Sequence, residues 1–379
     1  MNRRIEDKEE ASMYARKGHP KLVIDLNKLK NNIDKVMSIC EEQGVEVAGV
    51  IKGCTGLLPC AEQFEKAGCK WIASSRIEQL AELKESGIQT DLLMVRVPML
   101  SEAEDVVRYC DYSLNSEICV IKELNKQAGR QDKTHKVILM ADLGDLREGF
   151  WDKDEMIEAA LMVENEMYNL ELAGVGVNVG CYGSVMATPE KLAELVDVAE
   201  KIEEKIGREL EIISGGATTS LMRVIDGNLP KRINMLRIGE GILLAYDLKR
   251  LYGYDIDFLY QDVFTLRAEV IELKDKPSHP VGEIGYDAFG HKVEYEDRGI
   301  RRRALLALGK VDYGSPEEIR PRKQGVEVLG ASSDHTILDV QDFVDAGGSL
   351  KVGDVFEFDI NYASIVFVTN SANIEKVYI

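Results

Sequence analysis

The chain has 379 residues, of which 45% are hydrophobic, and a formal net charge of −19. This length allows a full hydrophobic core and about two domains, while the negative charge argues against nucleic acid or an anionic membrane as a partner. No apolar run approaches the roughly 20 residues that span a bilayer and the N-terminus lacks a signal-like apolar segment, so we expect a cytoplasmic protein.

The predicted elements begin after an extension over residues 1–20, to which the sequence assigns no role. "LVIDL" (22–26) reads as an extra strand that docks on a later β domain. From residue 27 to about 245, short apolar runs alternate with segments of helical spacing. The eight apolar runs, each a predicted strand, are 45–51, 70–74, 91–97, 111–115, 136–142, 170–179, 210–214 and 233–239.

The segments between these runs place apolar residues on one helical face. Residues 188–207 are the clearest case, with Thr188 as a predicted N-cap, Pro189 at the first helical position and Gly207 at the end. Eight strand–helix units within about 220 residues predict a closed (β/α)8 barrel over residues 21–250. An open doubly wound sheet is the alternative.

Beyond residue 250 the pattern changes, because strand-like runs follow one another without long helices. Glycine and proline separate them, as in "DKPSHPVGEIG". We therefore expect a mainly antiparallel β domain over residues 251–379. Its predicted strands are "LRAEVIEL", "RRALLAL", "VEVLG", "TILDV", "VFEFDI" and "SIVFV".

Barrel enzymes place their sites where the strands end. Two late loops, "SGGATTS" after the seventh strand and "LRIGEG" on the eighth, are rich in glycine and hydroxyl groups, which suits an anion. They favour a phosphate site, although ordinary turns have the same composition. The candidate residues are Ser214, Gly216, Thr218, Thr219, Gly239 and Glu240.

Lys52 ends the first strand, in "VEVAGVIKGCTG". A partly desolvated lysine near cationic groups loses its proton more easily and becomes a nucleophilic amine. A lysine together with a phosphate cradle is what pyridoxal 5'-phosphate (PLP) requires. The competing interpretation is a solvated surface lysine.

Two arginines complete this rim. Arg237 lies two residues before Gly239 and is placed to face the pyridine nitrogen of such a cofactor, which favours proton exchange over reactions through a long-lived carbanion. Arg147, in "DLGDLREGF", suits a substrate carboxylate or the cofactor phenolate. A salt bridge from Arg147 to Asp142, Asp145 or Glu148 is an equally good interpretation.

Three other features predict no further chemistry. "GVGVNVG" has the wrong spacing for a dinucleotide fingerprint. The seven cysteines include no CxxC pair, and the five histidines are scattered, so neither a disulfide framework nor a dedicated metal site is expected.

These strings together resemble the alanine racemase family, the barrel-plus-β-domain group of PLP enzymes (fold type III). The resemblance rests on Lys52, "DLGDLREG", "GVGVN", "SGGATTS" and "NMLRIGEGI" in the barrel. It continues through "VGEIGYDAFG", "RRRALLALGKVD" and "LGASSDHTILDV" in the second domain. Within the family the chain is most similar to the ornithine racemases.

The resemblance implies a role for several residues. Lys52 would form a Schiff base with PLP and act as one of two racemisation bases. Arg237 would face the pyridine nitrogen, and Arg147 the phenolate and substrate carboxylate. Phosphate-binding positions match Thr218, Gly239 and the backbone of Glu240, with Tyr362 as the C-terminal tyrosine that also reaches the phosphate.

The chain departs from the family at three positions. Gly56 stands where the family has a phosphate-binding tyrosine, and Asn178 where a histidine stacks on the ring. The second base, a tyrosine of the partner subunit, is best matched by Tyr286, with His335 and Tyr182 as fallbacks. A head-to-tail homodimer is therefore implied.

The expected reaction is interconversion of L- and D-enantiomers by two-base proton exchange at the α-carbon. Ornithine or another basic amino acid is the expected substrate, and Asp334, with Asp287 in reserve, is the candidate for its distal ammonium group. Tyr182, Ser333 and His335 complete the expected substrate pocket. The alternatives are an alanine racemase, a PLP-dependent decarboxylase of basic amino acids and a non-catalytic PLP carrier.

Overall fold

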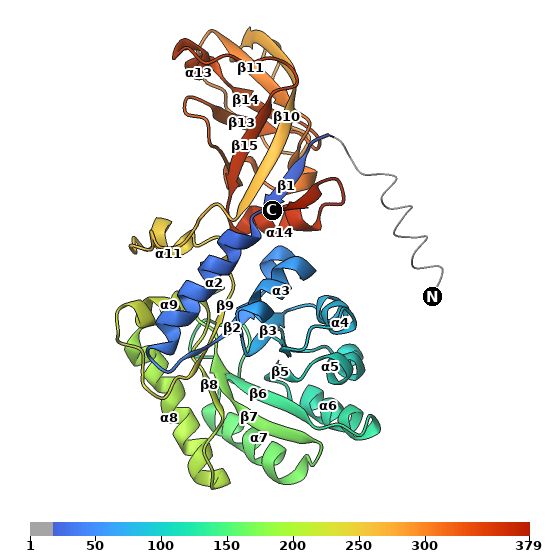
Figure 1. Ribbon diagram of the computed structural model, residues 1–379, viewed down its shortest axis with the longest axis vertical. Coiled ribbons are helices and arrows are strands. Elements are labelled where there is room, and N and C mark those ends of the chain that lie inside the picture. Colours follow the sequence, from blue (N-terminus) through green and yellow to red (C-terminus); the bar gives the residue numbers. More distant parts are fainter. Residues whose placement is uncertain (1–17) are drawn as a thin grey trace. The chain divides into compact units, whose positions relative to one another are not determined.

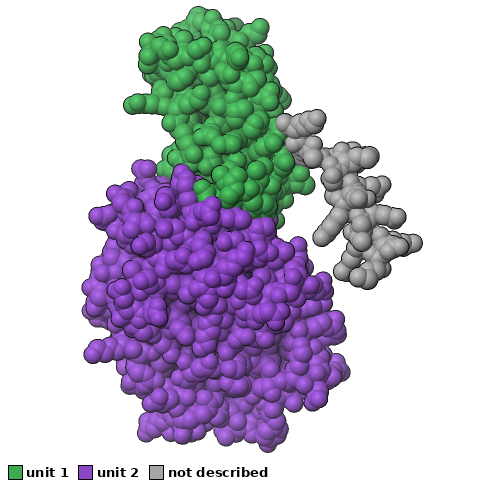
Figure 2. All heavy atoms as spheres, viewed as in Figure 1, with its two compact units in different colours: residues 1–25, 264–379 green, residues 26–263 purple. Residues whose placement is uncertain are grey.

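The computed structural model describes residues 18–379 (Figure 1). Residues 1–17, most of the predicted extension 1–20, lie outside the described residues. The described part of residues 1–25 together with 264–379 forms one compact unit, here the β unit, and residues 26–263 form the other, the barrel unit (Figure 2). The domain boundaries predicted at residues 20 and 250 stay a prediction. None of the helices within residues 18–379 is both long enough and apolar enough to span a membrane.

The barrel unit contains eight strands that close into a parallel barrel, in which β9 pairs back with β2. All eight predicted runs are confirmed as strands, and so is the (β/α)8 architecture. Both faces of a parallel sheet are covered, which explains why these runs are apolar without alternation. The strands are β2 (Glu46–Val50), β3 (Trp71–Ser74), β4 (Asp91–Met94), β5 (Tyr112–Asn115), β6 (His135–Ala141), β7 (Leu170–Val177), β8 (Ile212–Ser214) and β9 (Met235–Ile238).

Helices surround the barrel strands, as Figure 1 shows. The helix predicted over 188–207 is confirmed: the Thr188 side chain accepts a hydrogen bond from the Lys191 amide, and Gly207 ends the helix with φ 76°. The helices are α2 (Leu26–Glu41), η1 (Lys52–Cys54), α3 (Leu58–Lys66), α4 (Ile77–Glu85), η2 (Leu100–Glu102), α5 (Ala103–Tyr109), α6 (Ile118–Arg130), α7 (Lys153–Glu166), α8 (Pro189–Ile206), α9 (Thr218–Ile225), α10 (Glu240–Leu243) and α11 (Asp247–Arg250).

Side chains fill the barrel interior, so that it is a core and not a channel. Trp71 and Tyr112 meet edge to face, with their ring centroids 5.9 Å apart. Buried aliphatic side chains from every strand pack with them. A filled interior leaves the ends of the strands as the place for chemistry.

The β unit is built on an eight-stranded sheet in which β1 pairs with both β10 and β16. Every pair is antiparallel except β1 with β16, so the predicted mainly antiparallel domain is confirmed, as is the docking of the strand expected over 22–26. The strands are β1 (Lys21–Ile24), β10 (Phe264–Pro277), β11 (Ile300–Leu306), β12 (Ile319–Pro321), β13 (Glu327–Ala331), β14 (Thr336–Asp339), β15 (Val355–Ile360) and β16 (Glu375–Tyr378).

One predicted strand of this unit is wrong. "SIVFV" lies in helix α14 (Tyr362–Asn370), although its β-branched residues favour a strand. Asn361 caps the helix, because its side chain accepts from the Ser364 amide while the Ser364 hydroxyl accepts from the Asn361 amide. The other short helices of the unit are α12 (Lys310–Tyr313), η3 (Pro316–Glu318) and α13 (Gln341–Asp345).

Candidate active site

Lys52 stands directly after the first barrel strand. Ile51 still donates its amide to the Ala73 carbonyl at 2.9 Å, and the chain then turns through η1. Thr55 (φ 50°) and Gly56 (φ 73°) close the turn. Gly56 has φ +73°, and a Cβ there would lie 2.7 Å from Cβ of Gln79, so the tyrosine that the resemblance implies at this position would clash with Gln79.

The Lys52 amine has no hydrogen bond or ion pair with any residue of the described chain. Burial lowers the pKa of Lys52, and the positive charge of Arg147 lowers it further. Arg237 acts in the same direction, while Cys181 and Glu148 oppose it. A partly buried, unpaired amine with a lowered pKa is a nucleophile and a proton acceptor.

Arg237 belongs to β9, its guanidinium reaches the ends of β7 and β8, and it is only 4% exposed. Its Nη2 donates to the Val177 carbonyl at 2.7 Å, and its Nη1 donates to the Ser214 hydroxyl. Gly176 provides the space, since a Cβ there would lie 3.5 Å from Nη1 of Arg237 and 3.0 Å from Sδ of Met140. Burial lowers the pKa of Arg237 to about 10, so the guanidinium stays charged at neutral pH.

Two threonines link the loops at this end of the barrel: Thr218 joins the loops after β8 and β9, and Thr219 joins the loops after β7 and β8. Thr218 Oγ1 accepts from the Gly241 amide at 3.1 Å, and Thr219 Oγ1 donates to the Val179 carbonyl at 3.1 Å. Gly216 has φ +112°, and a Cβ there would lie 2.6 Å from Oγ of Ser220. The predicted glycine-rich loops are therefore brought together at one end of the barrel.

Unsatisfied donors line this junction. The amides of Gly216 and Gly239 form no hydrogen bond within residues 18–379. The buried Nδ2 of Asn178, at the end of β7, also lacks a protein acceptor there. Free backbone and side-chain donors at such a junction suit an anion.

Glu240 uses its side chain for another purpose. Its Oε1 accepts from the amides of Tyr246 at 2.7 Å and Asp247 at 3.0 Å. Burial, with the charge of Asp247, raises the pKa of Glu240 to about 7. Its Oε2 is buried without a hydrogen-bond partner within residues 18–379. The part of this residue that the family resemblance implies for anion binding is its backbone.

The segment "DLGDLREG" after β6 carries Arg147. Both Nε and Nη2 of Arg147 donate to the Glu148 carboxylate, and Nη1 contacts Sγ of Cys181 at 2.8 Å. Of the three salt-bridge partners considered from the sequence, Glu148 is the one that the structure places on Arg147. Asp142 instead accepts the amides of Gly144 and Leu146.

Asp145 organises the neighbouring loop between β7 and α8. It is 1% exposed, and its carboxylate accepts backbone amides of this loop at 3.0 to 3.4 Å. The donors are Gly180, Cys181, Tyr182 and Val185. Cys181 and the exposed Tyr182 are thereby held beside Arg147. Sequence reasoning missed this role, for which an aspartate flanked by glycine offered little signal.

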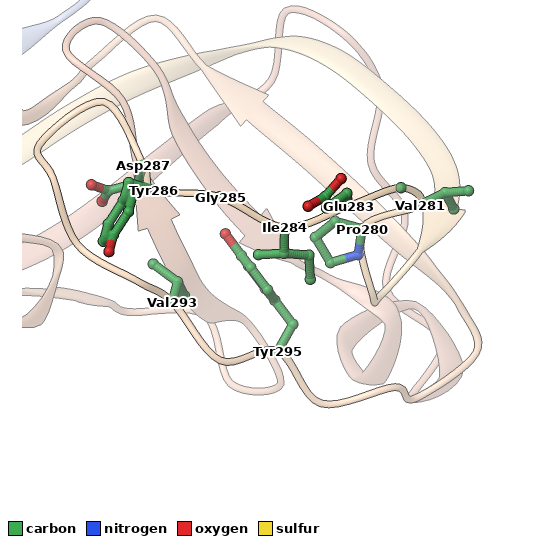
Figure 3. Close-up of a pocket in the computed structure, with 10 residues that line it drawn as sticks. Pro280, Val281, Glu283, Ile284, Gly285, Tyr286, Asp287, Val293 and Tyr295 are labelled. Atoms are coloured by element: carbon green, nitrogen blue, oxygen red, sulfur yellow. The ribbon is translucent and has the colours of Figure 1, made fainter.

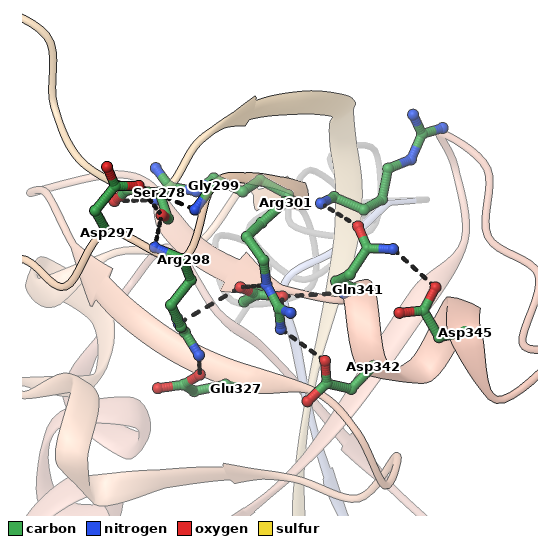
Figure 4. Close-up of polar contacts among 12 residues, drawn as sticks. Ser278, Asp297, Arg298, Gly299, Arg301, Glu327, Gln341, Asp342 and Asp345 are labelled. Carbon is green, nitrogen blue, oxygen red and sulfur yellow. Dashed lines mark hydrogen bonds and ion pairs between the residues drawn. The ribbon is translucent and has the colours of Figure 1, made fainter.

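Tyr286 belongs to the β unit, in the long loop that joins β10 to β11, and is 77% exposed. Figure 3 shows it beside Asp287 and Val293, around a pocket of about 150 Å³. The base of the loop is closed, because the Ser278 amide donates to the Gly299 carbonyl at 2.8 Å and the Arg298 amide donates to the Ser278 hydroxyl (Figure 4).

The remaining candidates also lie in the β unit. Ser333, Asp334 and His335 form the exposed turn between β13 and β14, where the Ser333 hydroxyl donates to the Asp334 carboxylate at 2.7 Å. Asp287 and the neighbouring Ser332 line one cavity of about 660 Å³. Tyr362 begins α14 and is half-buried.

The residues of the barrel mouth fit the cofactor that the sequence suggests. PLP needs an amine for its aldehyde and an anion site for its phosphate. The unpaired amine of Lys52 meets the first need, and the free amides of Gly216 and Gly239 meet the second. The orphaned Nδ2 of Asn178 is a further donor without a protein partner.

A family model and curated relatives identify the family, and solved structures share the fold. Residues 24–247 match the model of the N-terminal domain of alanine racemase. The chain is 41% identical to the ornithine racemase of Acetoanaerobium sticklandii, over 94% of this chain and 99% of that protein. It is also 41% identical to the lysine racemase of Thermotoga maritima, over 95% and 98%. An alanine racemase structure from Streptomyces lavendulae superimposes with a TM-score of 0.74 at 17% identity, covering 96% and 98%.

Proposed function

The chain belongs to the alanine racemase family, and from this premise we propose that it is a PLP-dependent racemase of basic amino acids, with ornithine or lysine as substrate. Two relatives of nearly the same length, named for ornithine and for lysine, support the choice of substrate. These two substrates differ by one methylene, which is worth only about 1–3 kcal/mol in a pocket.

Each candidate residue of the barrel would have its own role in binding the cofactor. Lys52 would hold the cofactor through its amine, and the loops containing Ser214, Gly216, Thr218, Thr219, Gly239 and Glu240 would hold the phosphate together with Tyr362. Arg237, fixed by the Val177 carbonyl and the Ser214 hydroxyl, would face the pyridine nitrogen. Asn178 would lie against the ring. PLP, when bound, supplies an electron sink that acidifies the α-proton of the attached amino acid.

The proton exchange needs two groups on opposite faces of the α-carbon. Nζ of Lys52 would take or return the proton on one face. The hydroxyl of Tyr286 from a second copy of the chain would do so on the other, which requires a head-to-tail homodimer; Tyr182 and His335 are the fallback groups. Arg147 would orient the α-carboxylate. Ser333 and Asp334, with Asp287 in reserve, would complete the pocket.

One observation carries the proposal: the Lys52 amine is partly buried, unpaired among the described residues and lowered in pKa by burial and by Arg147. Lysine amines on protein surfaces are solvated and protonated at neutral pH. An amine whose pKa is lowered by burial and by Arg147 loses its proton more easily, which suits it to hold an aldehyde and to move a proton.

The test follows the configuration of L-ornithine, L-lysine and L-alanine during incubation with the purified protein and PLP. We expect the D-enantiomer of ornithine or lysine to accumulate toward an equal mixture without release of carbon dioxide. Lys52→Ala should lower the rate at least about 10³-fold. Borohydride reduction followed by peptide mapping should find the cofactor on Lys52.

Lys153 provides the matched control at the same end of the barrel. Burial lowers the pKa of Lys153 as well, but its amine donates to the carbonyls of Asp142 and Phe150. Lys153→Arg should keep racemase activity. A protein that stays colourless with PLP, or that carries the cofactor on another lysine, would contradict the proposal.

Two other functions give different results in the same assay. An alanine racemase would turn over L-alanine faster than L-ornithine. A decarboxylase of basic amino acids would release carbon dioxide and produce a diamine.

A further inference from the structure

Three nitrogens of the Arg147 guanidinium already have protein partners in this structure. Its Nε and Nη2 donate to the Glu148 carboxylate and its Nη1 contacts Sγ of Cys181. Under the proposed function, on which this inference rests, the same guanidinium receives the α-carboxylate of the substrate. Glu148 occupies the Nε–Nη2 edge of the guanidinium, which is one of the two edges that bind a carboxylate through two hydrogen bonds. An α-carboxylate that binds this edge displaces Glu148.

A displaced Glu148 carboxylate has little access to water. Its side chain is 17% exposed and lies within the electrostatic range of Lys52 and Arg237. Separating the pair is unfavourable because the Glu148 carboxylate, the less exposed partner, is left without a positive charge beside it, whereas the Arg147 side chain is 35% exposed. A substrate that brings only a carboxylate would leave the Glu148 carboxylate without a positively charged partner.

A basic amino acid brings both charges. We infer that Glu148 determines substrate specificity by an exchange of ion pairs: the α-carboxylate of the substrate takes Arg147, and its side-chain ammonium takes Glu148. Arg147 and Glu148 are consecutive residues, so one small molecule with opposite charges at its two ends can contact both. An amino acid with an apolar side chain cannot complete the exchange.

The other carboxylates of this rim are committed elsewhere. Asp142 and Asp145 accept backbone amides of the loops around them. Oε1 of Glu240 accepts the amides of Tyr246 and Asp247, while its buried Oε2 has no partner within residues 18–379. Glu148 differs from these three because its partner is a side chain of the site itself, which the substrate is expected to engage.

The test compares Glu148→Gln with the wild-type protein in two assays. The first measures kcat/KM for L-ornithine and for L-alanine. We expect the ornithine-to-alanine ratio to fall about 10- to 100-fold, mainly through a higher KM for ornithine. Glu148→Asp, which keeps the charge, should recover most of the ratio.

The second assay needs no turnover. Calorimetric titration with 5-aminopentanoate and with pentanoate compares two carboxylates that lack an α-amine and differ in the distal ammonium. The wild-type protein should bind 5-aminopentanoate at least about tenfold more tightly, and Glu148→Gln should remove that preference.

Glu164→Gln is the matched control, since Glu164 binds Arg208 through two hydrogen bonds of 2.6 and 2.7 Å away from this site. Its ornithine-to-alanine ratio should stay within about twofold of wild type. Thermal unfolding of every variant verifies folding, and Glu148→Asp serves as the second variant if Glu148→Gln is unstable.

The outcomes separate the two proposals. If the wild-type protein racemises ornithine but Glu148→Gln keeps the wild-type ratio and ligand preference, the ion-pair exchange is overturned and the racemase function stands. The same holds if Asp334→Asn changes the ratio and Glu148→Gln does not. If the wild-type protein racemises no amino acid, the proposed function fails, and equal binding of the two carboxylates would then overturn the role of Glu148 as well.

Discussion

At the scale of single residues, the side chains of the barrel mouth divide into those that hold the backbone and those that act on Lys52. Asp145 belongs to the first group, because it accepts amides from the loop after β7. Arg147 and Glu148 belong to the second group, since their opposite charges shift the pKa of Lys52 in opposite directions. Adjacent residues with opposite effects make the protonation of Lys52 adjustable by single substitutions.

Arg147→Gln should raise the pKa of Lys52, because it removes the positive charge that acts with burial to lower it. Less of the amine is then neutral at a given pH, so the rate of acylation of Lys52 should reach half its maximum at a higher pH than in the wild-type protein. Mass spectrometry after pulsed acylation of the apoprotein measures this. Loss of the carboxylate anchor should also lower kcat/KM about 10- to 100-fold.

Glu148→Gln should shift the pKa of Lys52 in the opposite direction. Removing the negative charge should lower the pKa of Lys52 further and move the acylation profile to lower pH. If both substitutions move the profile in the same direction, the charges of this pair do not control Lys52.

At the scale of elements, a buried polar contact joins β5 to β6. The Ser113 hydroxyl and Nε2 of His135 are 2.8 Å apart, and Nδ2 of Asn115 donates to the same hydroxyl at 2.9 Å. All three residues are buried. Burial lowers the pKa of His135 from 6.5 to about 4, so the imidazole is neutral in the folded protein at neutral pH.

This histidine predicts how stability depends on pH. Between pH 6.5 and about 4 the unfolded chain binds the proton and the folded one does not, so the free energy of unfolding should fall as pH falls through this window and be unaffected by His135 above it. The contribution is on the order of 3 kcal/mol over the window. Urea unfolding at a series of pH values measures it.

His135→Gln removes the titrating group but keeps a polar partner for Ser113. The slope of unfolding free energy against pH should be smaller in this variant than in the wild-type protein over the same window. His335→Gln, which removes an exposed imidazole, controls for the loss of a histidine elsewhere. Equal slopes for wild type and His135→Gln would rule out this linkage.

At the scale of the whole molecule, the proposed site draws on both units of the chain. Lys52, Arg147 and Arg237 belong to the barrel unit, whereas Tyr286 and Tyr362 belong to the β unit. The head-to-tail dimer that we propose assigns Tyr286 to the site of a second copy. Closed dimers make such sharing reciprocal, so each pair of subunits would hold two equivalent sites.

Mixing two inactive variants tests this arrangement. Lys52→Ala chains and Tyr286→Phe chains, refolded together in equal amounts, should regain about a quarter of the wild-type activity, because half of the dimers are mixed and one of their two sites is intact. Each variant refolded alone is the control. Activity no higher than the mean of the two controls would mean that each site is built from one chain.

The sequence by itself determined the barrel, most of the β domain and the position of Lys52. The periodicity of strands and helices depends only on residues close together in the chain, and so do the ends of α8 at Thr188 and Gly207. These features can therefore be predicted from the sequence alone. The helical state of "SIVFV" was missed, since a capping box at Asn361 outweighed the strand preference of the β-branched residues.

Only the tertiary structure decided which ion pairs and hydrogen bonds the charged residues form. Three carboxylates were equally available to Arg147 in the sequence, but Asp142 and Asp145 are used by backbone amides, some of them 35 or more residues away in the chain, and Glu148 remains. The orphaned donors of Gly216, Gly239 and Asn178 likewise became visible only when distant loops met. Hydrogen bonds and ion pairs depend on distances between residues remote in sequence, and folding sets those distances.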